Sequence, residues 1–148
     1  MQRVNRQLCR YRPKASFFIC ATYLEIAPLS GEYELINAGL SLPWHGSDPL
    51  IAKGRPLGFS EKTVFGLFTD RLEPGQALFC HTDGLEDGRY SNGHPVGFDG
   101  VRRIVEELAQ ATGKRAAMAT HLEGIDLFDD ITALRLARPG EAAGRDHS

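Results

Sequence analysis

The sequence has few of the features that mark disulfide-rich, membrane or nucleic-acid-binding proteins. Its 148 residues include only three cysteine residues at wide spacing, Cys9, Cys20 and Cys80. This number and spacing exclude a disulfide framework and the paired cysteines of a zinc site, so we predict three free thiols. No run of about 18 apolar residues occurs, which excludes a membrane-spanning helix. The net charge of −2 gives no indication of nucleic-acid binding.

The start of the chain also lacks an apolar segment followed by a small-residue cleavage site, so it does not resemble a signal peptide. Together with the unpaired cysteines, this predicts a cytoplasmic protein. The length corresponds to one domain, and the 42% of hydrophobic residues is ordinary for a globular protein with a buried core.

The first half of the chain has the pattern of an initial helix followed by strands. Residues 1–10 carry apolar side chains at helical spacing. Residues 16–28 and 33–39 are rich in β-branched and aromatic side chains and predict a β-hairpin. Residues 62–72 and 77–82 predict a second hairpin around Pro74 and Gly75, which suit a type II turn. The intervening residues 40–49 are predicted to form a loop.

The second half changes to a helical period. Gly113 stands where a helix-ending glycine is expected. Before it, in the segment 98–113, four apolar residues recur at helical spacing: Val101, Ile104, Val105 and Leu108. Residues 88–97 are predicted to form a glycine-rich loop. Residues 114–123 can form another helix, and residues 131–137 a last strand. The whole pattern predicts an α+β fold with one antiparallel sheet of five strands.

Two acidic segments adjoin predicted strands. Asp83 and Gly84 follow one strand, with Glu86 and Asp87 close behind, and the segment Asp126–Asp130 precedes the last strand. Carboxylates of this kind suit Mg²⁺ or Mn²⁺, which prefer oxygen ligands, although Asp-Gly is also a common turn and Asp-Asp a common cap before a strand. We interpret His81 as structural. It is one of four histidines that show no metal-ligand spacing: His45, His81, His94 and His121.

The motifs together resemble a known family. The segments "INAGLSLPW", "RPLGF", "LEPGQALFCHTDGLEDGR", "GFDGVRRIVEEL" and "DLFDDITALRL" follow one another as in the SpoIIE-like branch of the metal-dependent serine/threonine protein phosphatases, the PPM or PP2C-type family. The resemblance runs from about residue 4 to residue 137, and the opening helix is similar to that of phosphatase output domains in response regulators. It implies an antiparallel β-sandwich flanked by helices, with two Mn²⁺ or Mg²⁺ ions in the complete domain.

The resemblance also implies roles for individual residues. Asp83 matches the aspartate of the family's T-D-G motif, a metal ligand, and Asp129 matches the ligand aspartate of the D-D or D-N motif. Gly84 and Asp130 would support the metal loop. In the family, the two ions activate a water that hydrolyses a phosphoserine or phosphothreonine directly. The expected substrate is a signalling phosphoprotein of the anti-sigma-factor antagonist type, and dimer formation is also anticipated.

One family motif has no match in this sequence. The D-x-S/T-G-H-G segment, whose aspartate bridges the two metals, precedes the first hairpin in the family. We therefore expect residues 1–137 to be the C-terminal portion of a phosphatase domain that is incomplete at its N-terminus, with residues 138–148 as a disordered tail. Such a chain should hold at most one weakly bound ion and have little activity. A pseudophosphatase or adaptor that binds protein partners is the alternative, and a generic α+β binding domain with solvated acidic loops is a third possibility.

Overall fold

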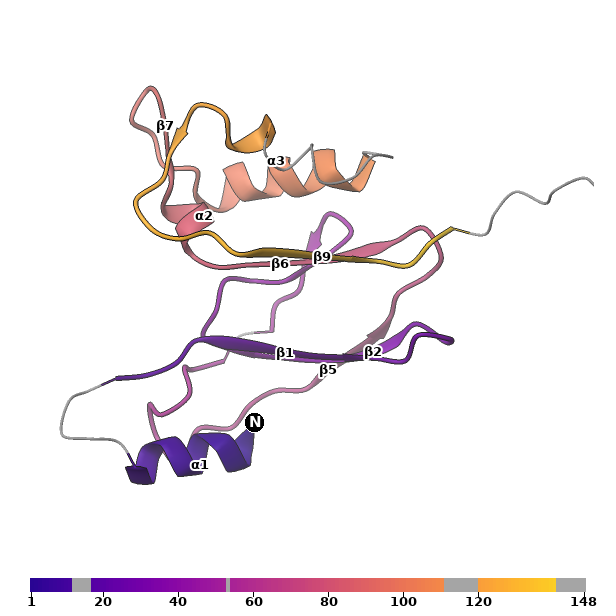
Figure 1. Ribbon diagram of the computed structural model, residues 1–148. Coiled ribbons are helices and arrows are strands. Elements are labelled where there is room, and N and C mark those ends of the chain that lie inside the picture. The colour runs from indigo at the N-terminus through magenta and orange to yellow at the C-terminus, as the bar shows by residue number, and fades with distance from the viewer. Residues whose placement is uncertain (12–16, 53, 111–119, 141–148) are drawn as a thin grey trace, which may run out of the picture.

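The computed structural model describes residues 1–11, 17–52, 54–110 and 120–140, in which two antiparallel sheets lie face to face between helices (Figure 1). One sheet has the strand order β1-β2-β5 and the other the order β4-β3-β6-β9, while β7 and β8 form a separate ribbon. Helix α1 lies outside the first sheet, and α2 and α3 lie outside the second. This architecture confirms the α+β class and the antiparallel β-sandwich flanked by helices.

The elements have the following bounds in chain order: α1 Gln2–Tyr11, β1 Ala21–Ile26, β2 Glu32–Ala38, β3 Trp44–His45, β4 Asp48–Pro49, β5 Phe68–Arg71, β6 Ala77–His81, α2 Gly84–Asp87, β7 Arg89–Tyr90, α3 Gly97–Gln110, β8 Ile125–Asp126 and β9 Ala133–Ala137.

The first predicted hairpin is confirmed. Strands β1 and β2 pair antiparallel, with Leu24 opposite Leu35. Alternation places Leu35 in the core and the neighbouring Glu34 at the surface, as a half-buried strand requires. Gly31 closes the connection with a positive φ of 81°, a conformation that glycine adopts without steric cost.

The second predicted hairpin is wrong. The turn itself forms, because the Gln76 amide donates to the Glu73 carbonyl at 3.0 Å and Gly75 has a φ of 89°. However, β5 pairs with β2 of the first sheet, whereas β6 pairs with β3 and β9 of the second. The turn therefore carries the chain from one sheet to the other. The predicted strand 62–72 is also shorter than expected, since only Phe68–Arg71 is extended in a sheet.

Two further predictions need correction. Residues 40–49 are not only a loop, because β3 and β4 form a small hairpin in which Trp44 pairs with Pro49. Residues 88–97 likewise contain β7, which pairs with β8. The strands do not form one sheet of five, since one sheet would leave an apolar face in water, and two sheets bury their apolar faces against each other.

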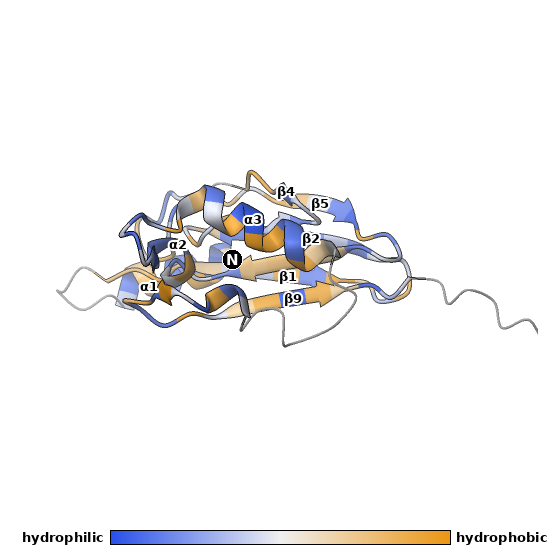
Figure 2. Ribbon diagram, turned by 90° about the horizontal axis from the view of Figure 1, so that it is seen from above, coloured by the Kyte–Doolittle hydropathy of each residue, from blue (hydrophilic) through white to orange (hydrophobic). Residues whose placement is uncertain are grey.

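The helix predicted within 98–113 is confirmed as α3, and its apolar stripe packs on the second sheet. The residues Trp44 and Phe79 are among those against which its apolar side chains pack. All four apolar residues that predicted the helix are buried there: Val101, Ile104, Val105 and Leu108. Hydrophobic and hydrophilic residues alternate along α3 in Figure 2, as expected for a helix that covers a sheet on one side.

A second cluster fills the space between the two sheets. Tyr33 and Leu35 of β2 pack there with Leu78 of β6, together with Leu50 and Leu72. Leu35 and Leu72 are completely buried. Each such leucine contributes about 1.5–3 kcal/mol through the removal of its side chain from water, so these contacts hold the sheets together.

Several predictions fall on residues outside the described ranges. These are the helix end at Gly113, most of the helix 114–123, of which Thr120–Leu122 is described as helical, and most of the tail 138–148. Arg138 is described, and its guanidinium donates to the carbonyls of Ser30 and Leu72 at 2.7 and 2.9 Å. Among the described residues, no helix is long and apolar enough to span a membrane.

Candidate metal site at the ends of β6 and β9

The two acidic segments singled out in the sequence leave the same end of the second sheet. Asp83 follows β6, and Asp129 and Asp130 precede β9. These two strands pair directly, with His81 opposite Ala133. The antiparallel pairing therefore places the end of one strand beside the start of the other, although Asp83 and Asp129 lie 46 positions apart in the sequence.

Thr82 joins the two segments through its backbone and its side chain. Its amide donates to the Thr132 carbonyl at 3.0 Å, and its Oγ1 accepts a hydrogen bond from the Thr132 amide at 2.9 Å. The same hydroxyl donates to the Asp130 carbonyl at 3.3 Å. These bonds fix the backbone on both sides of the site. The sequence motifs had indicated roles for the two aspartates but none for Thr82.

Gly84 allows the two segments to approach closely. It is buried, and a Cβ atom placed on it would lie 2.6 Å from the Asp130 carbonyl oxygen and 3.3 Å from that of Asp129. A real side chain does not tolerate the shorter of these separations. The two segments can therefore lie this close together only because residue 84 has no side chain.

The carboxylates of the site face water. Asp83 stands before the short helix α2, where its carbonyl accepts a hydrogen bond from the Asp87 amide at 2.9 Å, but its side chain makes no capping bond. Asp129 uses Oδ1 to accept the Asp130 amide at 2.7 Å. Asp83, Asp129 and Asp130 are all exposed. The Asp83 carboxylate and the second oxygen of Asp129 are thus available to a ligand.

His81 is buried behind the site, as the structural interpretation expects. Its Nδ1 lies 3.1 Å from the Thr82 carbonyl oxygen, and its Nε2 lies 3.9 Å from a Glu86 carboxylate oxygen. Within the described residues, Nε2 has no hydrogen-bond partner. Burial lowers the pKa of His81, an effect that the Thr82 carbonyl and the carboxylates of Glu86 and Asp83 oppose.

Two thiols lie near this end of the sandwich. Burial raises the pKa of Cys20, and the negative charge of Asp83 raises it further, so the Cys20 thiol is close enough to the site to sense that carboxylate. Burial alone raises the pKa of Cys80 to about 11. Cys9, Cys20 and Cys80 are all free, as predicted. The motif gave no indication that Cys20 lies near the site.

The other polar residues considered in the sequence lie apart from the candidate site or serve other contacts. Asp126 belongs to β8 and stands opposite Arg89 of β7. His45 contacts Asp70 and Gln76 at 3.2 and 2.9 Å, away from the acidic segments. His121 and His94 belong to other segments, and His121 pairs with Glu107 at 3.0 Å.

The donor set fits a hard divalent cation only in part. Two exposed aspartates on neighbouring segments provide the oxygen ligands that Mg²⁺ and Mn²⁺ prefer, and Mg²⁺ commonly keeps several waters beside one or two carboxylates. Among the described residues, no group of three or more histidine, cysteine, aspartate or glutamate side chains is arranged to hold a metal ion. The residues present therefore fit one ion bound largely by water and do not fit a two-metal centre.

Comparison with protein families decides the assignment. The model of the family described as Stage II sporulation protein E (SpoIIE) matches residues 1–139. The chain belongs to the SpoIIE family. Its members are serine/threonine phosphatase domains of the PP2C type that depend on Mn²⁺ or Mg²⁺. The comparison with curated proteins found no match.

Solved structures support the same fold. The SiaA PP2C domain of Pseudomonas aeruginosa superposes with a TM-score of 0.70 at 17% identity, covering 90% of this chain and 57% of that one. The phosphatase domain of SpoIIE from Bacillus subtilis gives 0.63 at 13% identity, covering 95% and 65%. The RsbU and RsbW domains of a Mycobacterium tuberculosis protein give 0.65 at 23% identity, covering 82% and 37%. The chain thus spans less than two thirds of each of these three chains.

Proposed function

We propose that this chain is part of a metal-dependent protein phosphatase domain in which Asp83 and Asp129 bind one Mn²⁺ or Mg²⁺ ion. The observation that carries the proposal is the contact of Gly84 with the Asp130 carbonyl, because it brings two otherwise distant aspartate segments to one strand end. The substrate would be a phosphoserine or phosphothreonine in a signalling protein. An anti-sigma-factor antagonist is the substrate type that the similarity to an RsbU domain favours.

Each residue of the site has a distinct task in this proposal. Asp83 and Asp129 supply negatively charged oxygens, and Thr82 holds their two segments at a fixed separation through its bonds to Thr132 and Asp130. Gly84 keeps the gap between the segments small. A divalent cation bound here would lower the pKa of a water molecule and offset the charge of a phosphoryl group.

An adaptor function is the second candidate, and one observation favours it. The described residues supply no group of three metal-ligating side chains, so an ion at Asp83 and Asp129 would lack a carboxylate that bridges it to a second ion. Two-metal hydrolysis uses such a pair of ions to stabilise both the attacking and the leaving oxygen. A chain that binds one ion weakly could retain the fold to bind a protein partner.

Calorimetric titration with Mn²⁺ tests the metal site. We expect binding by the unaltered chain that is lost in Asp83→Asn and in Asp129→Asn. Asp126→Asn serves as the matched control, because Asp126 is an exposed carboxylate of the same acidic segment that lies in β8. Absence of Mn²⁺ binding, or equal loss in all three variants, would refute the site.

Hydrolysis of p-nitrophenyl phosphate in the presence of Mn²⁺ then tests whether the chain itself is active. Turnover that Asp83→Asn abolishes and Asp126→Asn leaves intact supports the phosphatase. Mn²⁺ binding without turnover is expected of both candidates, because the described residues do not form a two-metal centre. An upstream coding sequence that contains the D-x-S/T-G-H-G motif then favours the phosphatase, and one that lacks it favours the adaptor. A phosphatase assay on a phosphoserine peptide from an anti-sigma-factor antagonist extends the test to the proposed substrate class.

A further inference from the structure

The segment between β4 and β5 forms a hollow beside helix α1. Two successive turns, residues 56–59 and 60–63, shape it, because in each turn the last amide donates to the first carbonyl, at 3.4 and 3.0 Å. The Asn5 side chain donates to the Ser60 carbonyl at 2.9 Å and so attaches the second turn to the helix. The hollow has a volume of about 460 Å³. We call it the basic pocket, and its lining consists of Gly54, Arg55, Ser60, Lys62, Thr63 and Val64.

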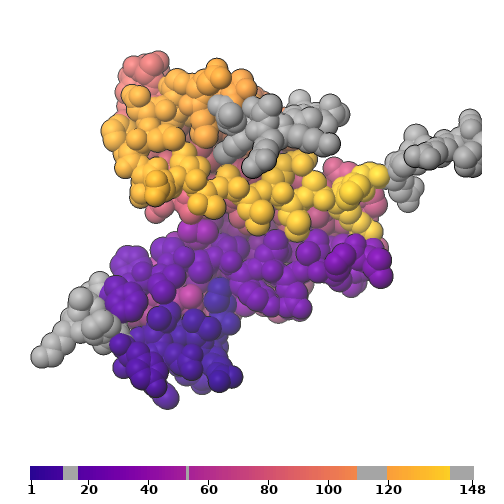
Figure 3. Space-filling model, viewed as in Figure 1, coloured from indigo at the N-terminus to yellow at the C-terminus, as the bar shows by residue number. Residues whose placement is uncertain are grey.

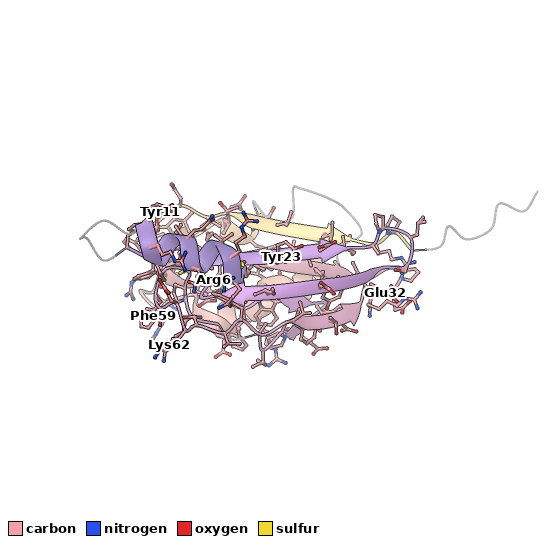
Figure 4. All side chains as sticks on the ribbon, turned by 90° about the horizontal axis from the view of Figure 1, so that it is seen from below. Arg6, Tyr11, Tyr23, Glu32, Phe59 and Lys62 are labelled. Atoms are coloured by element: carbon pink, nitrogen blue, oxygen red, sulfur yellow. The ribbon has the colours of Figure 1, made fainter. Side chains whose placement is uncertain are left out.

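Both charged groups of the basic pocket are positive. Arg55 and Lys62 are exposed and form no ion pair with any described residue. The Arg55 guanidinium carbon lies 5.0 Å from the centroid of the Phe59 ring, a contact that orients the guanidinium and leaves its N–H groups free to donate. Figure 4 shows Phe59 and Lys62 on the same side of α1. The one carboxylate of the two turns, that of Glu61, lies 4.0 Å from Arg10 and does not line the pocket.

Two residues with hydroxyl groups complete the polar lining. Ser60 Oγ accepts a hydrogen bond from the Lys62 amide at 3.3 Å, so its own hydrogen can be donated to a ligand. Thr63 is only 7% exposed, and its Oγ1 has no hydrogen-bond partner among the described residues. A buried hydroxyl without a partner costs free energy, and most buried polar side chains have one. An acceptor that enters the pocket lined by Thr63 would supply this missing partner.

These groups match a phosphate group in charge and in hydrogen bonding. A phosphomonoester has a charge of about −1.5 to −2 at neutral pH and three acceptor oxygens. The two cations of the basic pocket balance this charge, and guanidinium, ammonium and hydroxyl donors can bond to all three oxygens. A carboxylate, with one charge and two oxygens, would leave one cation without a partner. A bare phosphate ion would fill only a small part of about 460 Å³, so the pocket has room for the group that carries the phosphate.

We infer that the basic pocket binds the phosphate group of a phosphomonoester. The pocket lies beside α1, which is outside the first sheet, whereas Asp83 and Asp129 adjoin strands of the second sheet (Figure 1). In the space-filling view of Figure 3, α1 (indigo) stands out from the lower surface and β9 (yellow) crosses the upper part. The phosphate would be held by cations of the chain itself, without a metal ion. The inference is therefore independent of the proposed metal site.

Calorimetric titration of the full chain in metal-free buffer tests this inference. The probes are a phosphoserine peptide, AMP and inorganic phosphate at about pH 7.5, where a monoester with a second pKa of about 6 is a dianion. The unphosphorylated peptide serves as the blank. We expect at least one monoester to bind more tightly than inorganic phosphate. Tighter binding of the peptide identifies a phosphorylated protein as the source of the group, and tighter binding of AMP identifies a small molecule.

Neutral substitutions in the basic pocket should weaken this binding. Arg55→Gln and Lys62→Gln should each lower the affinity ~10-fold or more, because each removes a hydrogen bond from a charged donor. Thr63→Val keeps the shape of the buried side chain and should lower the affinity ~3-fold through the loss of its hydroxyl. Arg135→Gln is the matched control, since it makes the same change of charge at an exposed position of β9 and should leave the affinity unchanged. Circular dichroism melting shows whether each variant is folded.

Four results would overturn the inference. The first is that neither monoester binds, and the second is that inorganic phosphate binds as tightly as both. The third is that Arg135→Gln weakens binding as much as Arg55→Gln and Lys62→Gln do. The fourth is binding that appears only after Mn²⁺ is added, because it would place the phosphate at Asp83 and Asp129. Conversely, metal-independent binding that the pocket variants lose supports the basic pocket even if no Mn²⁺ binds to the two aspartates.

Discussion

Gly84 lies so close to the segment before β9 that a Cβ atom at this position would be 2.6 Å from the Asp130 carbonyl oxygen. The neighbouring group is backbone, which cannot rotate away as a long side chain can. Thr82, two positions earlier, donates to the same carbonyl, so the segment before β9 is held on both sides of Asp83. The placement of the candidate metal ligands therefore depends on the absence of a side chain at residue 84.

Gly84→Ala should push the two aspartate segments apart. We expect a loss of about 1–3 kcal/mol in the free energy of unfolding, which is typical when a side chain is forced into a packed site. Any Mn²⁺ affinity should fall as well, because Asp83 and Asp129 would separate. Urea denaturation followed by circular dichroism measures the first effect, and calorimetric titration measures the second.

Gly66→Ala is the matched control for this substitution. A Cβ atom at Gly66 meets nothing within 4 Å, and its φ is not in the left-handed region. We expect a change within ±0.5 kcal/mol, as for most surface substitutions. Equal stability losses in the two variants would show that the contact between Gly84 and Asp130 has no special role.

Asn5 attaches α1 to the rest of the molecule. It is completely buried, its Oδ1 accepts the Gly58 amide at 2.8 Å, and its Nδ2 donates to the Ser60 carbonyl at 2.9 Å. Asn5→Leu removes both bonds and should lower the free energy of unfolding by about 1–3 kcal/mol, because the buried Gly58 amide loses its bond to Asn5, whereas the Ser60 carbonyl keeps the bond from the Thr63 amide. Amide hydrogen exchange should show that α1 loses protection first. Gln7→Ala, at an exposed position of the same helix, should leave both measurements unchanged.

The sequence predicted those elements whose pattern is long and regular. The spacing of Val101, Ile104, Val105 and Leu108 is enough to identify α3, and all four residues are buried in the core. It could not predict β3 and β4, because strands of two residues are too short to show alternation. Nor could it show that β5 and β6 join different sheets, since a strand-turn-strand pattern gives no information about which partner each strand chooses.

The candidate site, like the fold, could be predicted only in part from the sequence. Asp83 and Asp129 could be selected from family motifs, and the pairing of β6 with β9 brings their segments together. The role of Thr82 could not be predicted from the sequence, because its bonds reach residues about 50 positions away. The proximity of Cys20 to Asp83 likewise depends on how the first sheet lies over the second, which no local sequence pattern records.

The pKa of Cys80 predicts a pH dependence of stability. Burial raises this pKa from 9.0 in the ordinary thiol to about 11, so the folded state favours the protonated form. The resulting stabilisation is complete below pH 9 and is lost as the pH rises through about 11. Between these values the free energy of unfolding should fall more steeply for the unaltered chain than for Cys80→Ala, by at most ~1.4 kcal/mol per pH unit, the limit for one proton. Equal slopes in urea titrations at pH 8.5–10.5 would contradict this prediction.

Arg138 holds two loops of the first sheet from the end of β9. Its guanidinium donates to the carbonyls of Ser30 and Leu72, and its second terminal nitrogen donates to the Leu29 carbonyl at 2.9 Å. Arg138→Lys should therefore cost about 1.5–3 kcal/mol, because a single ammonium group cannot reach three carbonyls in the directions that a planar guanidinium can. Arg135→Lys, at an exposed position of β9, should have little effect. If the two variants unfold at the same urea concentration, the connection between the sheets does not depend on Arg138, and the contacts of the core alone must hold the sandwich closed.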